Sequence, residues 1–319
     1  MFKEITTKSA IKVVHHSDAD GWCSAAIINA ITGRVLTSEN FIETNYRNMD
    51  DVVNKINDGD FVILVDVSFT ETTKVFLDEI IKKSAAIWWI DHHTSSVKLC
   101  ETYLIYNHIP GIRREELSGA PLTYICGYSL DIDEVLSNDI KPYPYVISLV
   151  DDHDRWKHQI SGTREFNMYT FSRKHEELLP GSGFWEDLIE GKSNINDYIK
   201  IGEKLLEFDT TEKERYCKLN AFESTINGIP CVVINRKCNS SIFGELYNHY
   251  PIVVTYGFDG FEYGYSLFSN RKDPNIDCSI IAEQYGGGGH KGAAGFATPE
   301  NIFSDVSKNK KINFKSFGL

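Results

Sequence analysis

The sequence predicts an α/β fold, in which a doubly wound, mainly parallel sheet is followed by a smaller mixed α/β domain. In the first half of the chain, short apolar runs alternate with helix-like segments, which is the pattern of parallel βαβ units. Beyond a Pro-Gly-Ser-Gly break at 180–183, one long polar helix leads into a hairpin pattern. We therefore expect a first domain over 1–190, a helical linker over 191–222 and a second domain over 223–319.

The elements of the first domain follow from apolar runs and from apolar residues at helical spacing. Strands are expected over 11–16, 61–66, 86–90 and 103–106. Helices are expected over 22–32, 71–83, 118–129 and 143–152. The flat runs of Val, Ile and Trp are typical of strands that are covered on both faces, as the strands of a parallel sheet are.

In the second half, Asn194 is a suitable N-cap for a long helix over 195–222. Strands are expected over 231–234 and 251–256, and Asp259-Gly260 predicts a turn into another strand over 263–267. A helix over 277–284 then leads into four consecutive glycines and His290. These elements predict a small mixed α/β domain.

Composition and charge narrow the class of protein. The chain has 319 residues and a formal net charge of −12, which disfavours binding of long nucleic acid over its whole surface. Its seven cysteines are scattered and form no C-x-x-C pair, which favours reduced thiols in a cytoplasmic protein. The first residues lack the apolar core of a signal peptide, and no apolar run reaches the roughly 20 residues of a membrane helix.

Residues of the metal-ligand type follow three of the predicted strands. His16, Asp18 and Asp20 have a two-residue spacing that would place them on one face of an extended segment. Asp66 ends the strand over 61–66, and Asp91-His92-His93 follow the strand over 86–90. Taken singly, each of these residues also has a purely structural interpretation, as part of a polar strand face, as a helix cap or as a structural histidine. Because parallel strands end at one sheet edge, together they predict a cluster typical of a two-metal hydrolase.

Two further segments are candidates for chemistry. Acidic residues at 151, 152 and 154 end a predicted helix, where negative charge opposes the helix dipole and a metal would offset that cost. The glycines at 286–289, with His290 and Lys291 after them, would let backbone amides approach a ligand closely. The alternative interpretation of these glycines is a flexible linker.

The combined motifs resemble those of the DHH phosphoesterase superfamily. Its four signature motifs correspond to His16-x-Asp18-x-Asp20-Gly21, Asp66, Asp91-His92-His93 and Asp154-Arg155-Trp156. The stretch Gly287-Gly288-Gly289-His290-x-x-Ala293-Ala294-Gly295 resembles the signature of the superfamily's associated C-terminal substrate-binding domain. Each motif alone is weak, but five in the right order across both halves of the chain are specific.

The resemblance implies two divalent cations, with Mn²⁺ favoured and Mg²⁺ or Co²⁺ as alternatives. The first ion would be held by His16 and Asp18, and the second by Asp20 and His92. Asp66 would bridge the two ions as a catalytic ligand, and His93 would contact the phosphate or assist the leaving group. Asp154 would complete the second ion, with Asp152 as the alternative.

The resemblance also implies the contacts to substrate. The nucleotide would be bound by Gly287, Gly288, Gly289 and His290. Superfamily members often carry Ser-Leu-Arg-Ser in the strand before the last helix, whereas this chain has Phe268 at the arginine position. Arg271 is then the residue expected to supply the missing positive charge.

The function that these residues predict is hydrolysis of short RNA or DNA oligonucleotides, or of dinucleotides, to mononucleotides by a nano-RNA exonuclease type of enzyme. A 3′,5′-bisphosphonucleotide phosphatase, a linear or cyclic dinucleotide phosphodiesterase and a single-strand DNA exonuclease share the same motifs and stay open. Two more distant alternatives are a pyrophosphatase-like hydrolase and a nucleotide-binding protein without catalysis. No membrane partner is expected, and a homodimer is one option for assembly.

Overall fold

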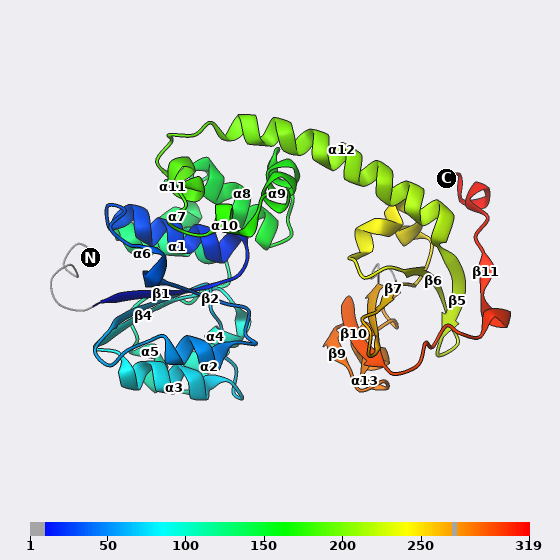
Figure 1. Ribbon diagram of the computed structural model, residues 1–319, viewed down its shortest axis with the longest axis horizontal. Coiled ribbons are helices and arrows are strands. Elements are labelled where there is room, and N and C mark those ends of the chain that lie inside the picture. Colours follow the sequence, from blue (N-terminus) through cyan, green and yellow to red (C-terminus); the bar gives the residue numbers. More distant parts are fainter. Residues whose placement is uncertain (1–9, 270–272) are drawn as a thin grey trace. The chain divides into compact units, whose positions relative to one another are not determined.

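The computed structural model describes residues 10–269 and 273–319 (Figure 1). The chain forms two compact units, Met1–Leu206 and Glu207–Leu319, and the helix α12 (Ile195–Asn220) passes from one to the other. Each unit has a sheet and hydrophobic clusters of its own. The two units are therefore described separately.

The sheet of the first unit has four parallel strands in the order β2-β1-β3-β4. These strands are β1 (Ile11–His16), β2 (Phe41–Thr44), β3 (Phe61–Val65) and β4 (Ala86–Ile90). From β1 the chain first adds a strand on one side and then continues on the other side with β3. This reversal creates a switch point between β1 and β3, and ligand sites of open α/β sheets form at the carboxyl ends of such strands.

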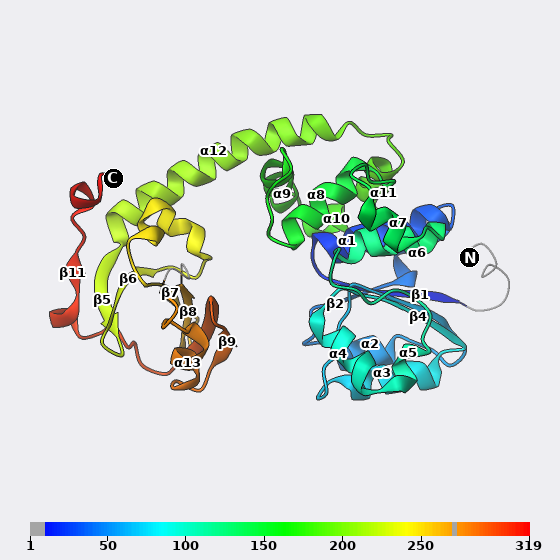
Figure 2. The same cartoon turned by 180° about the vertical axis from the view of Figure 1, so that it is seen from behind.

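Helices cover both faces of this sheet, which confirms the doubly wound prediction (Figures 1 and 2). Neighbouring strand residues point to opposite faces, so Val13 packs in one cluster and Val14 in the other. The helices on the Val13 side include α1 (Ala19–Ile31), α6 (Gly119–Tyr128), α8 (Tyr145–Asp154) and α11 (Phe184–Ile189). Those on the Val14 side include α2 (Met49–Asn54), α3 (Lys74–Lys83) and α4 (Thr94–Thr102).

The strand expected over 103–106 is wrong, because this stretch follows α4 and forms the short helix α5 (Leu104–Asn107). The apolar residues of this stretch pack as part of a helix. Tyr106 is buried, and its hydroxyl donates a hydrogen bond to Asp78 Oδ1 at 2.7 Å. The sequence also did not predict β2, the helices α2, α4 and α11, or three further short helices of the Val13 side. These three are α7 (Ile132–Ser137), α9 (Thr163–Phe171) and α10 (His175–Leu178).

One edge of the sheet is covered by the chain that follows α5. The backbone N–H of Trp89 donates to Pro110 O at 2.8 Å, and that of Asp91 donates to Ile112 O at 2.9 Å. Between these bonds, Gly111 has a φ of 123°, and a Cβ there would lie 2.1 Å from Trp89 O. Only glycine fits such a close approach, so this residue allows the segment to lie against β4.

The second unit contains a seven-stranded mixed sheet in the order β11-β5-β6-β7-β8-β10-β9. The pair β6–β7 is parallel, and the other pairs are antiparallel. The predicted hairpin is confirmed, with a four-residue turn that starts at Asp259, whose Oδ1 accepts from Phe261 N and Glu262 N. The strands are β5 (Phe222–Ile226), β6 (Ile229–Asn235), β7 (Ile252–Phe258), β8 (Tyr263–Ser269), β9 (Gly288–His290), β10 (Ala293–Thr298) and β11 (Lys310–Lys311).

The two faces of this second sheet have separate clusters. Helix α13 (Cys278–Glu283) packs on one face with Tyr265 and Phe296, and the 3-10 helix Ser240–Asn248 packs on the other with Val232 and Val253. The sheet is thus covered on both sides, which confirms a small mixed α/β unit.

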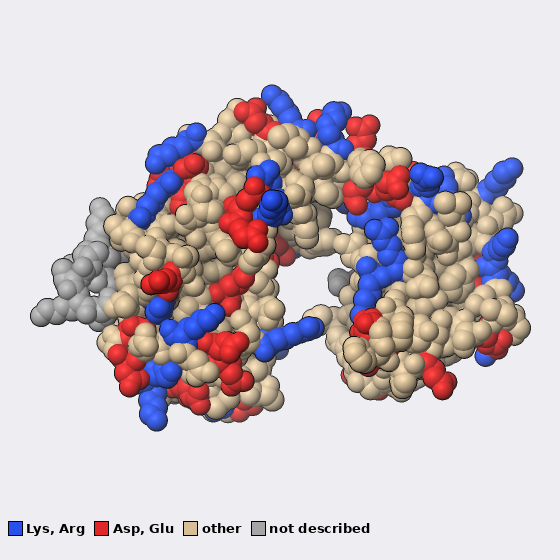
Figure 3. Space-filling model, viewed as in Figure 1, with Lys and Arg blue, Asp and Glu red and all other residues tan. Residues whose placement is uncertain are grey.

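Three general properties of the chain concern its cysteines, its helices and its surface charge. All seven cysteines are free thiols, and all except Cys238 are buried. No helix within residues 10–269 and 273–319 has both the length and the apolar character that crossing a membrane requires. On the face of the first unit that Figure 3 shows, acidic and basic side chains are interspersed.

Candidate metal centre

Three parallel strands deliver polar side chains to one edge of the first sheet. His16 is the last residue of β1, Asp66 directly follows β3, and Asp91 to His93 directly follow β4. Asp66 has a φ of 55°, a left-handed conformation that is rare outside glycine and is typical of functional turns. The structure therefore brings these residues together, as the sequence predicts.

Asp18 and Asp20 reach the same place by a different route from the one expected. Helix α1 begins at Ala19, with Asp18 as its N-cap accepting from Gly21 N at 3.0 Å. The expectation of one extended face for His16, Asp18 and Asp20 is thus wrong, because Asp20 lies in the first helical turn. A Cβ on Gly21 would lie 2.3 Å from His16 O, so glycine is what allows this tight strand-to-helix turn.

Three groups of potential ligand atoms form at this edge, and within each group all atoms lie within 4.8 Å of one another. The groups are His16, Asp18 and Asp66; Asp66, His92 and His93; and Asp20, His92 and Asp154. Asp66 and His92 each belong to two groups. We refer to these seven residues as the ligand cluster.

Individual distances show how close these atoms are. On one side, His16 Nδ1 lies 2.6 Å from Asp18 Oδ2 and 3.9 Å from Asp66 Oδ2. On the other side, His92 Nε2 lies 3.3 Å from Asp66 Oδ1, 3.5 Å from Asp154 Oδ2 and 3.8 Å from Asp20 Oδ2. The two oxygens of Asp66 thus face opposite halves of the ligand cluster.

The N-terminus of α6 holds Asp20 in place, a feature that the sequence did not predict. Asp20 Oδ1 accepts from Ser118 Oγ at 2.8 Å and from Ala120 N at 2.9 Å, and its Oδ2 accepts from Gly119 N at 2.6 Å. A Cβ on Gly119 would lie 2.8 Å from Asp66 Cβ and 2.9 Å from Asp20 Oδ2. The Ser-Gly-Ala sequence at a helix start was the available signal, because such starts bind anions.

The structure also separates the two acids of the fourth motif. Asp152 accepts hydrogen bonds from Gln159 N and Ile160 N, both at 3.0 Å, and from Thr163 Oγ1 at 2.6 Å. Burial alone would raise its pKa, but these bonds hold that pKa below its usual value. Asp152 therefore fixes the turn that follows α8, whereas Asp154 points into the ligand cluster.

The electrostatics of the ligand cluster fit bound cations. Burial, together with the charges of Asp20 and Asp18, raises the pKa of Asp66 well above its usual value and that of Asp154 to about 8. Asp66 Oδ1 is buried, and no donor in the described part of the chain hydrogen-bonds to it. Buried carboxylates without donors are costly unless a cation compensates them, so the donor set suits hard divalent ions.

His93, which also belongs to the ligand cluster, is about one-third exposed. Its Nδ1 lies 2.8 Å from Asp91 Oδ1 and 3.8 Å from Asp66 Oδ1. Burial alone would lower the pKa of His93, but the hydrogen bond to Asp91 and the surrounding carboxylates raise it to about 9. Asp91 thereby fixes the orientation of this imidazole.

The predicted substrate loop of the second unit is an ordered edge strand. Within β9, Gly289 pairs with Ala294 and His290 with Ala293 of β10, and the residues of β9 are exposed. Gly289 has a φ of 144°, and a Cβ there would lie 2.5 Å from Ala294 Cα. Gly289 thus serves close strand packing, and because Gly288 and Gly289 lie within a paired strand, the alternative of a flexible linker is wrong.

The arginine that was expected to contact the substrate, Arg271, lies outside the described residues. Phe268, at the usual arginine position, is half-buried and packs against the cluster that contains Val232 and Val253. The structure therefore gives Phe268 a packing role in this sheet.

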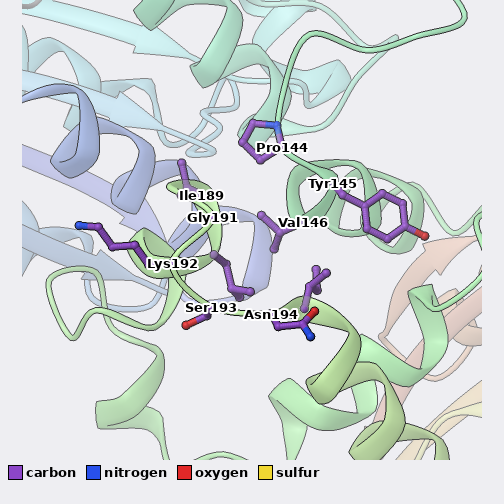
Figure 4. Close-up of a pocket in the computed structure, with 10 residues that line it drawn as sticks. Pro144, Tyr145, Val146, Ile189, Gly191, Lys192, Ser193 and Asn194 are labelled. Carbon is purple, nitrogen blue, oxygen red and sulfur yellow. The ribbon is translucent and has the colours of Figure 1, made fainter.

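A cavity of about 480 Å³ lies elsewhere in the first unit, between the start of α8 and the start of α12 (Figure 4). Its lining includes Tyr145, Lys192 and Asn194, and it shares no residue with the ligand cluster. It therefore does not contribute to the candidate metal centre.

Mn²⁺ is expected to raise the melting temperature of the metal-free protein. A folded-state pKa above the unfolded value means that the folded protein holds the proton more tightly, so its stability falls as pH rises. For Asp154 this loss extends from its ordinary pKa of 3.8 to about 8. Saturating Mn²⁺ contributes about 2.7 kcal/mol at a hundredfold excess over Kd, which is roughly 5–10 °C for a unit of this size.

Differential scanning fluorimetry after chelation checks this expectation. The gain with Mn²⁺ should be larger near about pH 8 than near about pH 5, since at the lower pH protons compete for the carboxylates. Ca²⁺ at the same concentration tests ion preference. A melting temperature that does not respond to any divalent ion would contradict the metal centre.

No family model matches the chain. Uncharacterized protein R106 of Acanthamoeba polyphaga mimivirus is 29% identical over 248 residues, which cover 74% of this chain and 52% of R106. The chain thus spans about half the length of this curated relative.

Among solved structures, the similarity covers almost the whole chain and concerns its fold. The structure is similar to the pGpG-specific phosphodiesterase PggH of Vibrio cholerae, with a TM-score of 0.55, 15% identity, and coverage of 93% of this chain and 96% of PggH. RecJ of Thermus thermophilus in complex with Mn²⁺ gives a TM-score of 0.49 and 15% identity, with coverage of 93% of this chain and 50% of RecJ.

Proposed function

We propose that the chain is a metal-dependent phosphoesterase that hydrolyses short oligonucleotides, RNA or DNA, to mononucleotides. The observation that carries this proposal is the position of Asp66. Its two oxygens face two groups of ligand atoms, and one oxygen is buried without a hydrogen-bond donor in the described residues. A carboxylate placed in this way is suited to bridge two ions.

The roles of the ligand cluster follow from its three groups. His16, Asp18 and Asp66 would hold one cation, and Asp20, His92, Asp154 and Asp66 would hold the other. The cations, when bound, supply the charge that stabilises the phosphate and lowers the pKa of an attacking water. Asp91 orients His93, so that the exposed part of this imidazole can contact the phosphate or the leaving oxygen.

The substrate proposal is based on charge and on the second unit. A chain with a formal net charge of −12 is poorly suited to hold long strands, which are usually bound along a basic groove. The exposed edge strand β9, with Gly287 before it and Gly288, Gly289 and His290 within it, would contact the nucleotide. A dinucleotide phosphodiesterase is the second candidate function, because PggH, which shares the fold, is pGpG-specific.

An assay on 5′-labelled RNAs, from dinucleotides to long strands, tests this function. We expect turnover that stops in excess EDTA and returns with Mn²⁺, and rates that decrease with substrate length. A 3′,5′-bisphosphonucleotide, a cyclic dinucleotide and a long single DNA strand, assayed side by side, distinguish the related activities. Full turnover in EDTA would contradict the proposal.

A further inference from the structure

A second cavity of the first unit adjoins the ligand cluster. It has a volume of about 470 Å³, within the range of small-molecule sites. Residues of α1, α8, α9 and α10 line it, and Asp18, Asp20 and Asp154 of the ligand cluster are among them. The cavity therefore lies next to the place that a phosphate at the ligand cluster would occupy.

The walls of this cavity are largely aromatic and apolar. Trp22, Phe166 and Phe171 contribute rings, and Leu149 and Leu178 contribute aliphatic surface. Phe171 is 77% exposed, although it is the last residue of a well-packed helix. Flat, accessible aromatic faces of this kind stack well on nucleobases.

Trp156 adds a further exposed ring at the same cavity. It is 68% exposed and has a φ of 54°, a conformation that bulky side chains rarely adopt. The hydrogen bonds of Asp152 to Gln159 and Ile160 hold the turn that carries it. Backbone strain that places a large apolar ring in solvent is typical of a binding site.

Polar side chains also line the cavity. Trp22 Nε1 donates to Glu43 Oε1 at 2.6 Å, and His175 Nε2 lies 3.0 Å from the same carboxylate, so the indole is held in position. The side-chain amide of Asn167 also lines the cavity, and within the described residues no hydrogen bond engages it. A free amide has both a donor and an acceptor, as recognition of a base edge requires.

We infer that this cavity binds the nucleoside attached to the phosphate at the ligand cluster. The base stacks on Phe171 and Trp156, and the Asn167 amide contacts its edge. This inference rests on the proposed function, since it takes the phosphate to lie at the ligand cluster. It adds a base-recognition site within the first unit itself.

Calorimetric titration of the full chain in Mn²⁺ tests the site without requiring turnover. The ligands are AMP, GMP, CMP, UMP and ribose 5-phosphate, which has the phosphate and sugar but no base. We expect the nucleotides to bind at least roughly tenfold more tightly than ribose 5-phosphate, since stacking is worth about 1–3 kcal/mol per base. Phe171→Ala and Asn167→Ala should each remove most of that difference and leave ribose 5-phosphate binding unchanged.

Tyr128→Ala is the matched control, because Tyr128 is a half-exposed aromatic residue of the same unit outside this cavity. Equal binding of AMP and ribose 5-phosphate by the unaltered protein, or unchanged AMP binding in Phe171→Ala, would overturn the inference. Hydrolysis of a dinucleotide is measured in parallel. Turnover without base-dependent binding rejects only the cavity, whereas base-dependent binding without turnover supports the cavity and rejects the proposed function.

Discussion

Asp66→Asn is expected to lower Mn²⁺-dependent turnover by about a thousandfold or more while the protein stays folded. Asn has nearly the same size as Asp and tolerates the left-handed φ of 55° at this position, so the turn after β3 is preserved. It lacks the negative charge that two ligand groups share. Charge stabilisation by bound ions is worth several kcal/mol, and each 1.36 kcal/mol corresponds to tenfold in rate.

Initial rates on a dinucleotide, together with the number of bound Mn²⁺ ions from calorimetry, check this expectation. Asp60→Asn is the matched control, because Asp60 is also buried in the first unit but accepts its side-chain hydrogen bonds from Asn57, from N at 2.8 Å and from Nδ2 at 3.5 Å. We expect this control to bind the normal number of ions. Near-normal turnover with two bound ions in Asp66→Asn would show that Asp66 does not bridge them.

Gly119→Ala is expected to have the second-largest effect, although it changes no ligand. The added Cβ would lie 2.8 Å from Asp66 Cβ, an atom that cannot move without its backbone. The start of α6 must therefore shift, and Asp20 would lose its shortest hydrogen bond, the one from Gly119 N. We expect a roughly hundredfold loss of kcat/KM, because ligand geometry displaced by a fraction of an ångström is costly, and a destabilisation of about 1–3 kcal/mol.

Steady-state kinetics and urea unfolding measure the two effects of Gly119→Ala. Ser118→Ala is the comparison, because it removes one hydrogen bond to Asp20 without adding volume. We expect its loss of kcat/KM to be about tenfold or less, in keeping with one hydrogen bond to a charged group. Equal losses in the two variants would argue against a steric role for Gly119.

The sequence predicted the ligand cluster because residues at strand ends can be recognised from the few residues that precede them. An apolar run followed by Asp66, or by Asp91 to His93, needs only parallel pairing to place its last residues at a shared edge. Asp20 lies in the ligand cluster as predicted, but the local structure predicted for it, an extended segment, was wrong. A short strand-to-helix turn brings residues together as an extended segment would, and period-two spacing does not distinguish the two.

Other features depend on packing between distant segments and could not be predicted. The hydrogen bonds from the start of α6 to Asp20 join residues about 100 positions apart. The difference between Asp152 and Asp154 depends on which carboxylate the loop over 159–163 approaches. The helix α5 was mistaken for a strand because a short apolar run fits either period.

The segment over 110–112 that lies against β4 also restricts how copies of the chain can associate. An unpaired strand at a sheet border is a template onto which a foreign strand can add, and this route leads to domain swapping and fibrils. Here the backbone groups of Trp89 and Asp91 are already occupied, and Gly111 permits that occupation. Self-association of the first unit by addition of a strand to β4 is thus blocked.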